Sequence, residues 1–271
     1  HTYDSENGRN WRDDSINARY KTAVVVNRRL YAGNCKVTDN TGQTRVYGDS
    51  MFITPVDQYD ILNASMRDDV TRADGDEIVK LELLDDRLLQ FKKNKLHILN
   101  VSNYDNTILE GTYDYRGVDT PAAVCKIPNG IVWANFNGVF FFDGNDVIDL
   151  FVKDDERKIA VRDTSVQLEE RDDGDAYLER ISWRDFLTTD KSLDGSGTDT
   201  RLVPMVGHSP NRNKIIIFDS QDYVSSSTYT DPPVMIYDLL TTSWTHGSQI
   251  SAVDASGHSR MIRSLKTNFI N

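Results

Sequence analysis

The side chains that could carry out chemistry are mainly carboxylates. Asp172, Asp173 and Asp175 lie in one acidic run, and Asp85 and Asp86 form a second pair. Two carboxyl groups about 5–10 Å apart could hydrolyse a glycoside, with one as acid and the other as base or nucleophile. Aspartate is also favoured in turns, and 42 acidic residues produce such clusters by chance. We therefore interpret both clusters as turn residues and predict no catalytic residue.

One stretch resembles the start of a calcium-binding loop. Asp190, Ser192 and Asp194 provide oxygen atoms at positions 1, 3 and 5, and Gly195 permits the sharp turn that follows. Position 12 is Arg201, where such a loop needs a bidentate glutamate. The match therefore fails at its end, and we predict an ordinary polar loop without a metal ion.

The remaining reactive side chains show no pattern of a catalytic or cofactor site. No phosphate loop, dinucleotide fingerprint or Gly-x-Ser-x-Gly nucleophile motif occurs. Cys35 and Cys125 lie in apolar, strand-like runs, which predicts reduced, buried thiols. The histidines considered as metal ligands, whose spacing does not fit a site, are His97, His208, His246 and His258. We predict that the protein is not an enzyme and has no cofactor.

Composition and charge narrow the class of protein further. The 271 residues carry a net charge of −11, which disfavours capture of nucleic acid through its phosphates. No stretch approaches the roughly 18 uninterrupted apolar residues of a membrane span. The chain begins at His1, and its end reads as an interrupted strand, so we expect a soluble piece of a longer polypeptide.

The elements that must position these side chains are short strands. β-Branched and aromatic runs alternate with clusters of Gly, Asn, Asp and Pro, which is typical of antiparallel sheets. Similar units start at Arg29, Arg87, Ile131 and Lys214, and the last interval is about twice a blade of roughly 40–50 residues. We predict an all-β, β-propeller-like fold of repeated antiparallel four-stranded sheets, with a pair of β-sandwiches as the alternative.

Several turns and core positions follow from this pattern. Asn137 and Gly138 lie between apolar runs, which predicts a hairpin with a type I′ turn. Trp133 and Phe141 are predicted to be buried between sheets. The lysines at the turn near Asn94, namely Lys92, Lys93 and Lys95, are predicted to keep the strand ends solvated.

The organisation along the chain has four parts. Charge runs and a predicted helical turn at 179–187 interrupt the strand pattern between the third unit, which starts at Ile131, and the fourth, which starts at Lys214. The parts are an N-terminal contact segment (1–22), propeller blades (23–153), a charged insertion or degenerate blade (154–200) and kelch-like blades (201–271).

An ordered set of segments, including Gly-Ile-Val-Trp-Ala-Asn at 130–135, carries a family resemblance. The set resembles propeller-bearing structural proteins of bacteriophage tails, such as the nozzle or tubular protein B of short-tailed phages. The segments are 27–34, 85–92, 96–99, 117–125, 128–135 and 138–144.

The resemblance implies a structural protein of the virion, located in the phage tail, that forms part of the genome-delivery conduit. It implies a homo-oligomeric ring, expected to be a hexamer, which contacts other tail proteins such as the adaptor and fibres. Genomic DNA would pass without specific binding, helped by acidic residues in the lumen. The insertion 154–200 and the segment 3–17 with Trp11 are expected at contacts between subunits. The alternatives are an extracellular carbohydrate-binding or glycan-cleaving propeller and a cytosolic kelch-type adaptor.

Overall fold

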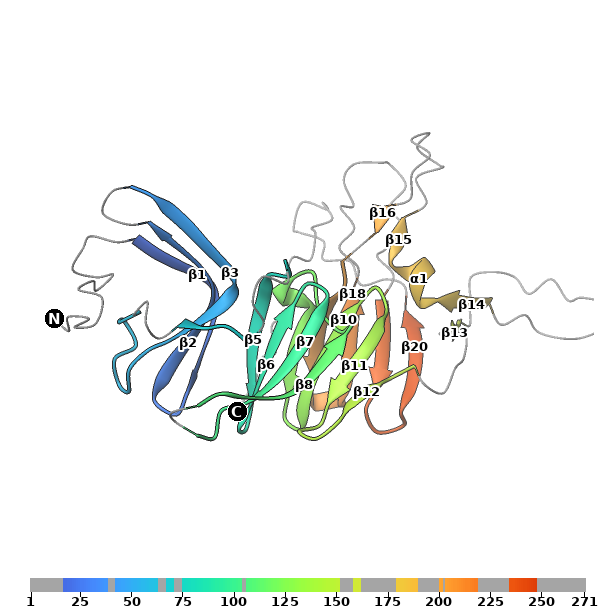
Figure 1. Cartoon of the computed structure of the whole chain (residues 1–271). Coiled ribbons are helices and arrows are strands. Elements are labelled where there is room, and N and C mark those ends of the chain that lie inside the picture. The colour runs from blue at the N-terminus through green and yellow to red at the C-terminus, as the bar shows by residue number, and fades with distance from the viewer. Residues whose placement is uncertain are drawn as a thin grey trace, which may run out of the picture. The chain divides into compact units, whose positions relative to one another are not determined.

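The computed structural model describes residues 17–38, 42–62, 67–70, 75–103, 106–151, 158–161, 179–189, 200–201, 203–218 and 234–247. The chain divides into two compact units, residues 1–121 and 122–271. Nearly every element in the described residues is a β-strand, and the arrows of Figure 1 group into separate small sheets. No helix in these residues is long and apolar enough to span a bilayer.

The first unit contains two four-stranded antiparallel sheets, and in each the strands are neighbours in the order of the chain. The first sheet consists of β1 (Asn17–Val26), β2 (Arg29–Thr38), β3 (Thr44–Ile53) and β4 (Arg67–Asp68). The second sheet consists of β5 (Ile78–Leu84), β6 (Arg87–Lys92), β7 (Lys95–Asn100) and β8 (Ile108–Asp114).

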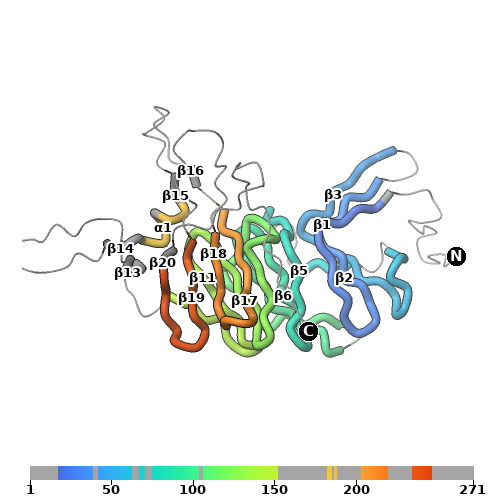
Figure 2. The backbone as a smooth tube through the Cα atoms, turned by 180° about the vertical axis from the view of Figure 1, so that it is seen from behind, coloured from blue at the N-terminus to red at the C-terminus, as the bar shows by residue number. Residues whose placement is uncertain are grey.

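The second unit repeats this arrangement in a third and a fourth sheet, which Figure 2 shows from behind. The third sheet consists of β9 (Val124–Ile127), β10 (Gly130–Asn135), β11 (Gly138–Phe142) and β12 (Val147–Asp149). The fourth sheet consists of β17 (Met205–Ser209), β18 (Lys214–Phe218), β19 (Val234–Asp238) and β20 (Ser243–Gly247).

The charged insertion between these two sheets contains smaller elements. Its described residues form two-stranded ladders and one short helix, which interrupt the four-stranded repeat. The elements are β13 (Lys158–Val161) with β14 (Glu179–Ser182), α1 (Trp183–Phe186), and β15 (Thr188–Thr189) with β16 (Thr200–Arg201). Two 3-10 turns lie at Pro121–Ala123 and Pro210–Arg212.

The predicted fold class is confirmed: the chain is all-β, with propeller-like repeated four-stranded antiparallel sheets and an irregular charged insertion. Each sheet is a meander in chain order, whereas most β-sandwiches contain Greek-key crossovers. The four predicted unit starts lie at or next to the first residue of β2, β6, β10 and β18, the second strand of each sheet. The similarity between units therefore resides in the second strand and the turns beside it.

The hydrophobic core of the first unit lies between its two sheets. Tyr31 and Met51 of the first sheet pack with Leu81, Leu88 and other apolar side chains of the second. The sheets approach closely at Gly33, where a Cβ atom would lie 3.1 Å from a methyl group of Ile78. A glycine at this position therefore allows the two sheets to share one core.

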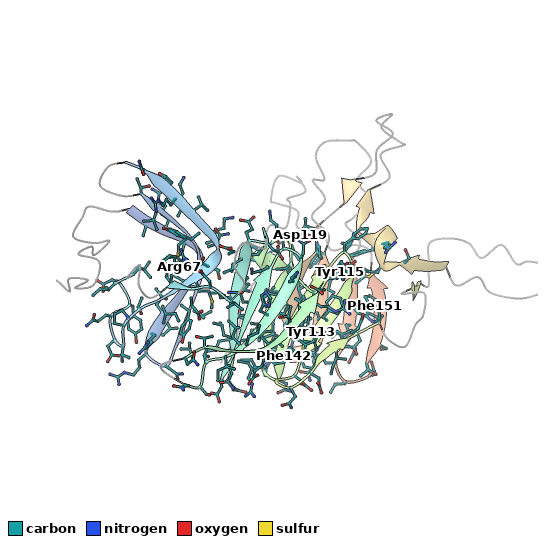
Figure 3. All side chains as sticks on the ribbon, viewed as in Figure 1. Arg67, Tyr113, Tyr115, Asp119, Phe142 and Phe151 are labelled. Atoms are coloured by element: carbon teal, nitrogen blue, oxygen red, sulfur yellow. The ribbon has the colours of Figure 1, made fainter. Side chains whose placement is uncertain are left out.

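The core of the second unit combines side chains of its two sheets with the helix of the insertion. Phe151, labelled in Figure 3, stacks on Trp244 with ring centroids 4.5 Å apart and an angle of 3° between the rings. Trp183 of α1 is buried, and its indole N–H donates a hydrogen bond to the Asn135 carbonyl oxygen at 2.8 Å. Trp133 is fully buried, as predicted, whereas Phe141 is only partly buried.

The predicted hairpin between β10 and β11 is present, but the prediction of a type I′ turn is wrong. Asn135 pairs with Gly138, so the two turn residues are Phe136 and Asn137, and neither has positive φ. The type I′ signature, positive φ at both central positions, occurs instead at Asn27 and Arg28 in the two-residue turn between β1 and β2. Gly138 is the first residue of β11 and has a φ of 154°, a value that residues with a side chain rarely adopt.

One further prediction needs correction. Lys92 is fully buried, because β6 is covered on both faces, so only Lys93 and Lys95 of the three lysines have partly solvated side chains. β1 begins at Asn17, so residues 17–22 of the predicted contact segment belong to the first sheet, and their role at contacts between subunits stays a prediction. Polar and apolar residues alternate in 17–22, and no turn residue separates them from the rest of the strand. Residues 1–16, which include Trp11, and residues 248–271 lie outside the described part of the chain.

Candidate functional site

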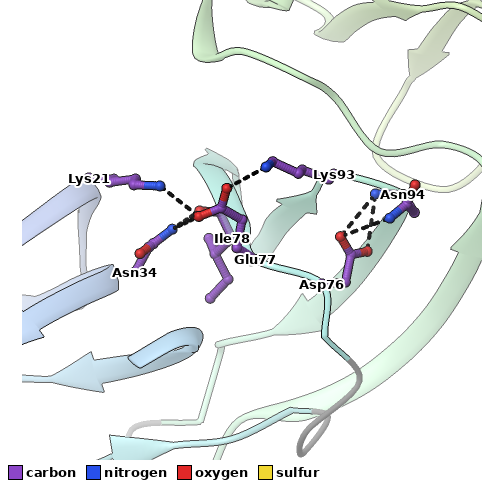
Figure 4. A network of polar contacts seen from close by, with 7 residues as sticks. All are labelled: Lys21, Asn34, Asp76, Glu77, Ile78, Lys93 and Asn94. Carbon is purple, nitrogen blue, oxygen red and sulfur yellow. Dashed lines mark hydrogen bonds and ion pairs between the residues drawn. The ribbon is translucent and has the colours of Figure 1, made fainter. Parts of the chain in front are cut away.

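The main polar cluster of the first unit surrounds Glu77, the residue directly before β5 (Figure 4). Glu77 Oε2 accepts hydrogen bonds from Lys21 Nζ of β1 at 2.6 Å and from Asn34 Nδ2 of β2 at 2.9 Å. Glu77 Oε1 lies 2.7 Å from Nζ of Lys93 in the turn between β6 and β7. One carboxylate therefore connects two strands of the first sheet with two elements of the second.

Asn34 reaches Glu77 because the backbone of β2 changes direction there. Its φ is 56°, and the pairing of β2 with β3 shifts register between Gly33 and Cys35, which marks a bulge. Asparagine tolerates this left-handed conformation better than most residues. The buried Asn34 amide also donates to the Ile78 carbonyl oxygen at 2.8 Å, so it satisfies a backbone acceptor at the start of β5.

A second carboxylate fixes the turn between β6 and β7. The backbone N–H of Asn94 donates to Asp76 Oδ2 at 3.0 Å, and the Asn94 side-chain amide donates to Oδ1 at 3.2 Å. The backbone N–H of Lys93 donates to the Glu77 carbonyl oxygen at 3.2 Å. Asp76 is buried, so these hydrogen bonds hold the turn in the position that brings Lys93 to Glu77.

The charges of the cluster stabilise one protonation state. Hydrogen bonds from Lys21, Lys93 and Asn34 lower the pKa of Glu77 to about 2, against a smaller opposite effect of burial. The hydrogen bond and charge of Glu77 in turn raise the pKa of Lys93. Glu77 is therefore ionised at neutral pH and holds no proton to transfer. The cluster can tie the two sheets together, but its protonation state does not suit general acid catalysis.

Of the carboxylates considered for glycoside hydrolysis, the structure describes Asp85 and Asp86. Asp85 and Asp86 form the turn between β5 and β6, where Asp85 has a φ of 51°. The Asp86 carbonyl oxygen accepts a hydrogen bond from the Val101 N–H at 2.9 Å. Both are turn residues, as interpreted from the sequence. The others, Asp172, Asp173 and Asp175, and the calcium-loop residues Asp190, Ser192, Asp194 and Gly195 lie outside the described residues, whereas Arg201 ends β16.

The histidines considered as metal ligands lie on different strands. His97 of β7 is buried, with Nδ1 3.0 Å from the Thr112 hydroxyl oxygen. His208 is buried on β17, His246 lies in β20, and His258 lies outside the described residues. The described part of the chain contains no group of three or more His, Cys, Asp or Glu side chains arranged to hold a metal ion.

Both cysteines are buried free thiols, as predicted. Burial raises the pKa of the Cys35 thiol to about 12, so this side chain stays protonated at neutral pH. Cys125 lies in β9, and its Sγ is 3.7 Å from the Lys126 carbonyl oxygen. The reactive thiolate form is therefore disfavoured at Cys35, and that side chain serves as part of the core.

The Glu77 cluster was missed by the sequence interpretation. Its members are distant in the sequence, with Lys21 and Asn34 lying 56 and 43 residues before Glu77. The available local signals were Asn34 after Gly33, typical of a left-handed bulge position, and the Asp-Glu pair directly before β5. Neither signal shows which strands pair.

Comparisons with known proteins give distant structural likenesses only. No protein-family model matches the sequence, and no curated protein sequence matches it. The N-terminal domain of Nup159 matches with 11% identity and a TM-score of 0.34, over 90% of this chain and 64% of that chain. The S. cerevisiae complex of Dbp5 with Nup159 and Gle1 matches with 12% identity and a TM-score of 0.32, over 86% and 60%. KlHsv2 with loop 6CD replaced matches with 10% identity and a TM-score of 0.27. Likenesses this distant assign neither a family nor a function.

Proposed function

We propose that the chain is a structural protein of a phage tail, of the nozzle or tail-tube type, that contributes to the conduit for the genome. The observation that carries the proposal is the resemblance of the ordered segments between residues 27 and 144 to propeller-bearing tail proteins. The proposal concerns a scaffold that acts by packing against its neighbours, with no substrate to convert.

The position of the resembling segments supports this proposal. Five of the six segments fall on the inner strands of three sheets, namely on β2, β6, β7, β10 and β11, and the sixth, 117–125, covers the 3-10 turn before β9 and the first residues of that edge strand. Most side chains of β6 and β10 are buried, so the segments describe how the sheets are packed. A resemblance carried by buried strands concerns the architecture of the protein and points to no catalytic site.

The Glu77 cluster supports a structural role on independent grounds. Its carboxylate is ionised and bonded to groups of both sheets, so this charged group stabilises the fold. In the proposed assembly, subunits contact one another head to tail in a closed ring, for which we propose six-fold symmetry. Adaptor and fibre proteins are the proposed neighbours, and DNA passes without specific binding.

The test combines the isolated protein with the particle. Native mass spectrometry and electron microscopy of the purified chain are expected to show rings, and antibodies against it are expected to label the tails of particles from cells that carry its gene. Label on no particle would overturn the proposal. Hydrolysis of a surface glycan that is abolished by Asp173→Asn or Asp175→Asn would replace it with the carbohydrate-cleaving alternative.

A further inference from the structure

The first sheet carries a basic segment in an acidic protein. Residues 17–48 contain six Lys and Arg residues and one acidic residue, Asp39. The whole chain has a net charge of −11, so all other residues together carry −16. The positive charge is therefore concentrated in the first three strands.

Two of these cations lie directly opposite each other. Arg19 of β1 pairs in register with Lys36 of β2, and Lys36 pairs with Val46 of β3. Residues directly opposite in antiparallel strands share one face, with Cβ atoms about 4.5–5.5 Å apart. All three side chains are exposed, and Val46 is 65% exposed. We call Arg19, Lys36 and Val46 the basic strip.

Two other cations of this sheet already have partners: Lys21 is bound to Glu77, and Arg28 forms an ion pair with Asp57. Within the described residues, the side chains of Arg19 and Lys36 form no hydrogen bond or ion pair. Like charges directly opposite each other destabilise a sheet. A surface that supplies carboxylates would reduce this repulsion, and the described residues of the sheet place no carboxylate in contact with Arg19 or Lys36.

We propose that the basic strip binds an acidic surface of a second copy of this chain. Charge complementarity supports this occupant, because the remainder of each copy carries −16. The proposal rests on the proposed function, since a ring requires a contact between two different surfaces of the same subunit. Val46 adds an exposed apolar side chain beside the two cations, which suits a protein surface.

A nucleic acid is the less favoured occupant. The strip presents two cations on one face, whereas DNA binding draws on many phosphate contacts. The net charge of −11 repels a polyanion at longer range, and this repulsion is strongest at low salt. A carboxylate-bearing protein surface needs only local complementarity, which the strip provides.

The experiment measures self-association of the whole chain by sedimentation velocity at low and high salt. The wild-type protein is expected to associate with rising concentration, and less at high salt, because the contact is ionic. Arg19→Glu is expected to weaken association at least tenfold. Its thermal midpoint is expected to equal or exceed that of the wild type, since the substitution places a carboxylate opposite Lys36. The matched control is Arg212→Glu, which makes the same charge change at an exposed arginine of the second unit and is expected to associate like the wild type.

Three results would overturn the inference. The first is a wild-type protein that stays monomeric at all concentrations. The second is an equal loss of self-association in Arg19→Glu and Arg212→Glu. The third is binding of DNA by the wild-type protein that Arg19→Glu abolishes. The last result would assign the strip to nucleic acid. If association depends on Arg19 but antibodies label no tails, the role of the basic strip is upheld and the phage-tail proposal is refuted. If antibodies label tails but association does not depend on Arg19, the phage-tail proposal is upheld and the role of the basic strip is refuted.

Discussion

Replacing Glu77 with glutamine tests whether the first two sheets depend on its charge. Glu77→Gln keeps the shape of the side chain but leaves Lys21 and Lys93 without the carboxylate between them. The Asn34 amide also loses its charged acceptor, although its hydrogen bond to the Ile78 carbonyl oxygen can remain. We therefore expect the first unit to lose stability without a change of fold.

The magnitude follows from the pKa and the exposure of the cluster. A fall of the Glu77 pKa from 4.5 to about 2 corresponds to about 3 kcal/mol in the absence of screening, since one pKa unit is worth about 1.4 kcal/mol. Solvent screens the interaction, because the Glu77 and Lys21 side chains are 33% and 58% exposed, and we expect about 1–2 kcal/mol. The unfolded carboxyl protonates below pH 4.5 and the folded one only near pH 2, so this stability is complete above pH 4.5 and is lost as the pH falls between these values.

Urea unfolding followed by circular dichroism, at pH 7 and at pH 3, measures the difference between Glu77→Gln and the wild type. The difference is expected to be about 1–2 kcal/mol at pH 7 and smaller at pH 3. The control is Glu110→Gln, whose carboxylate bonds to Arg87 and Asn100 within the second sheet alone. Equal stability of wild type and Glu77→Gln at pH 7, or the same difference at both pH values, would refute the reasoning.

Four further outcomes are expected. Trp133→Ala should lower the free energy of unfolding by about 3–5 kcal/mol, because it empties a fully buried site; a wild-type melting temperature would contradict the packing of β10. Gly117→Ala should lower the melting temperature clearly, because its Cβ would lie 2.4 Å from the backbone oxygen of Lys92, and unchanged melting would show that the approach is looser. Burial lowers the pKa of His208, so its contribution to stability is complete above pH 6.5 and is lost as the pH falls; His208→Phe should flatten this dependence between pH 7 and pH 5 in urea titrations. The protein should not retard DNA in gels even at low salt, and a shifted band would contradict the argument from net charge.

The unit starts predicted at Arg87, Ile131 and Lys214 agree with strands of the second, third and fourth sheets because the turns of these sheets are local. Asp143 shows why: its Oδ1 accepts hydrogen bonds from the N–H groups of Asn145 and Asp146, so the Asp-Gly-Asn-Asp signal closes the turn by itself. Asp238 does the same with Leu240 and Thr241 before β20. A turn whose hydrogen bonds all lie within its own few residues can be recognised from the sequence without knowledge of the fold.

The failures depended on distant parts of the chain. Lys92 is buried because β6 is covered on both faces, and a lysine beside a turn otherwise indicates solvent. The sequence of β3 contains two short apolar runs, 46–47 and 51–53, separated by Gly48, Asp49 and Ser50, which are typical turn residues, yet pairing with β2 and β4 holds all of them in one strand. The Glu77 cluster required knowledge of which strands meet. Local propensity yields to tertiary pairing at all of these positions.

The strict chain order of the strands determines when each sheet can form during synthesis. Every ladder of the four-stranded sheets joins sequence neighbours, so a sheet has all of its hydrogen-bond partners once its fourth strand has left the ribosome. Short separations between partners also make ladder formation fast, because little loop entropy is lost. The apolar faces of the sheets are buried later. Leu81 and Leu88 of the second sheet pack with Tyr31 of the first, so this core can form only after the second sheet has been synthesised. A nascent first sheet is therefore complete in hydrogen bonds while one of its faces is still exposed to water and to chaperones.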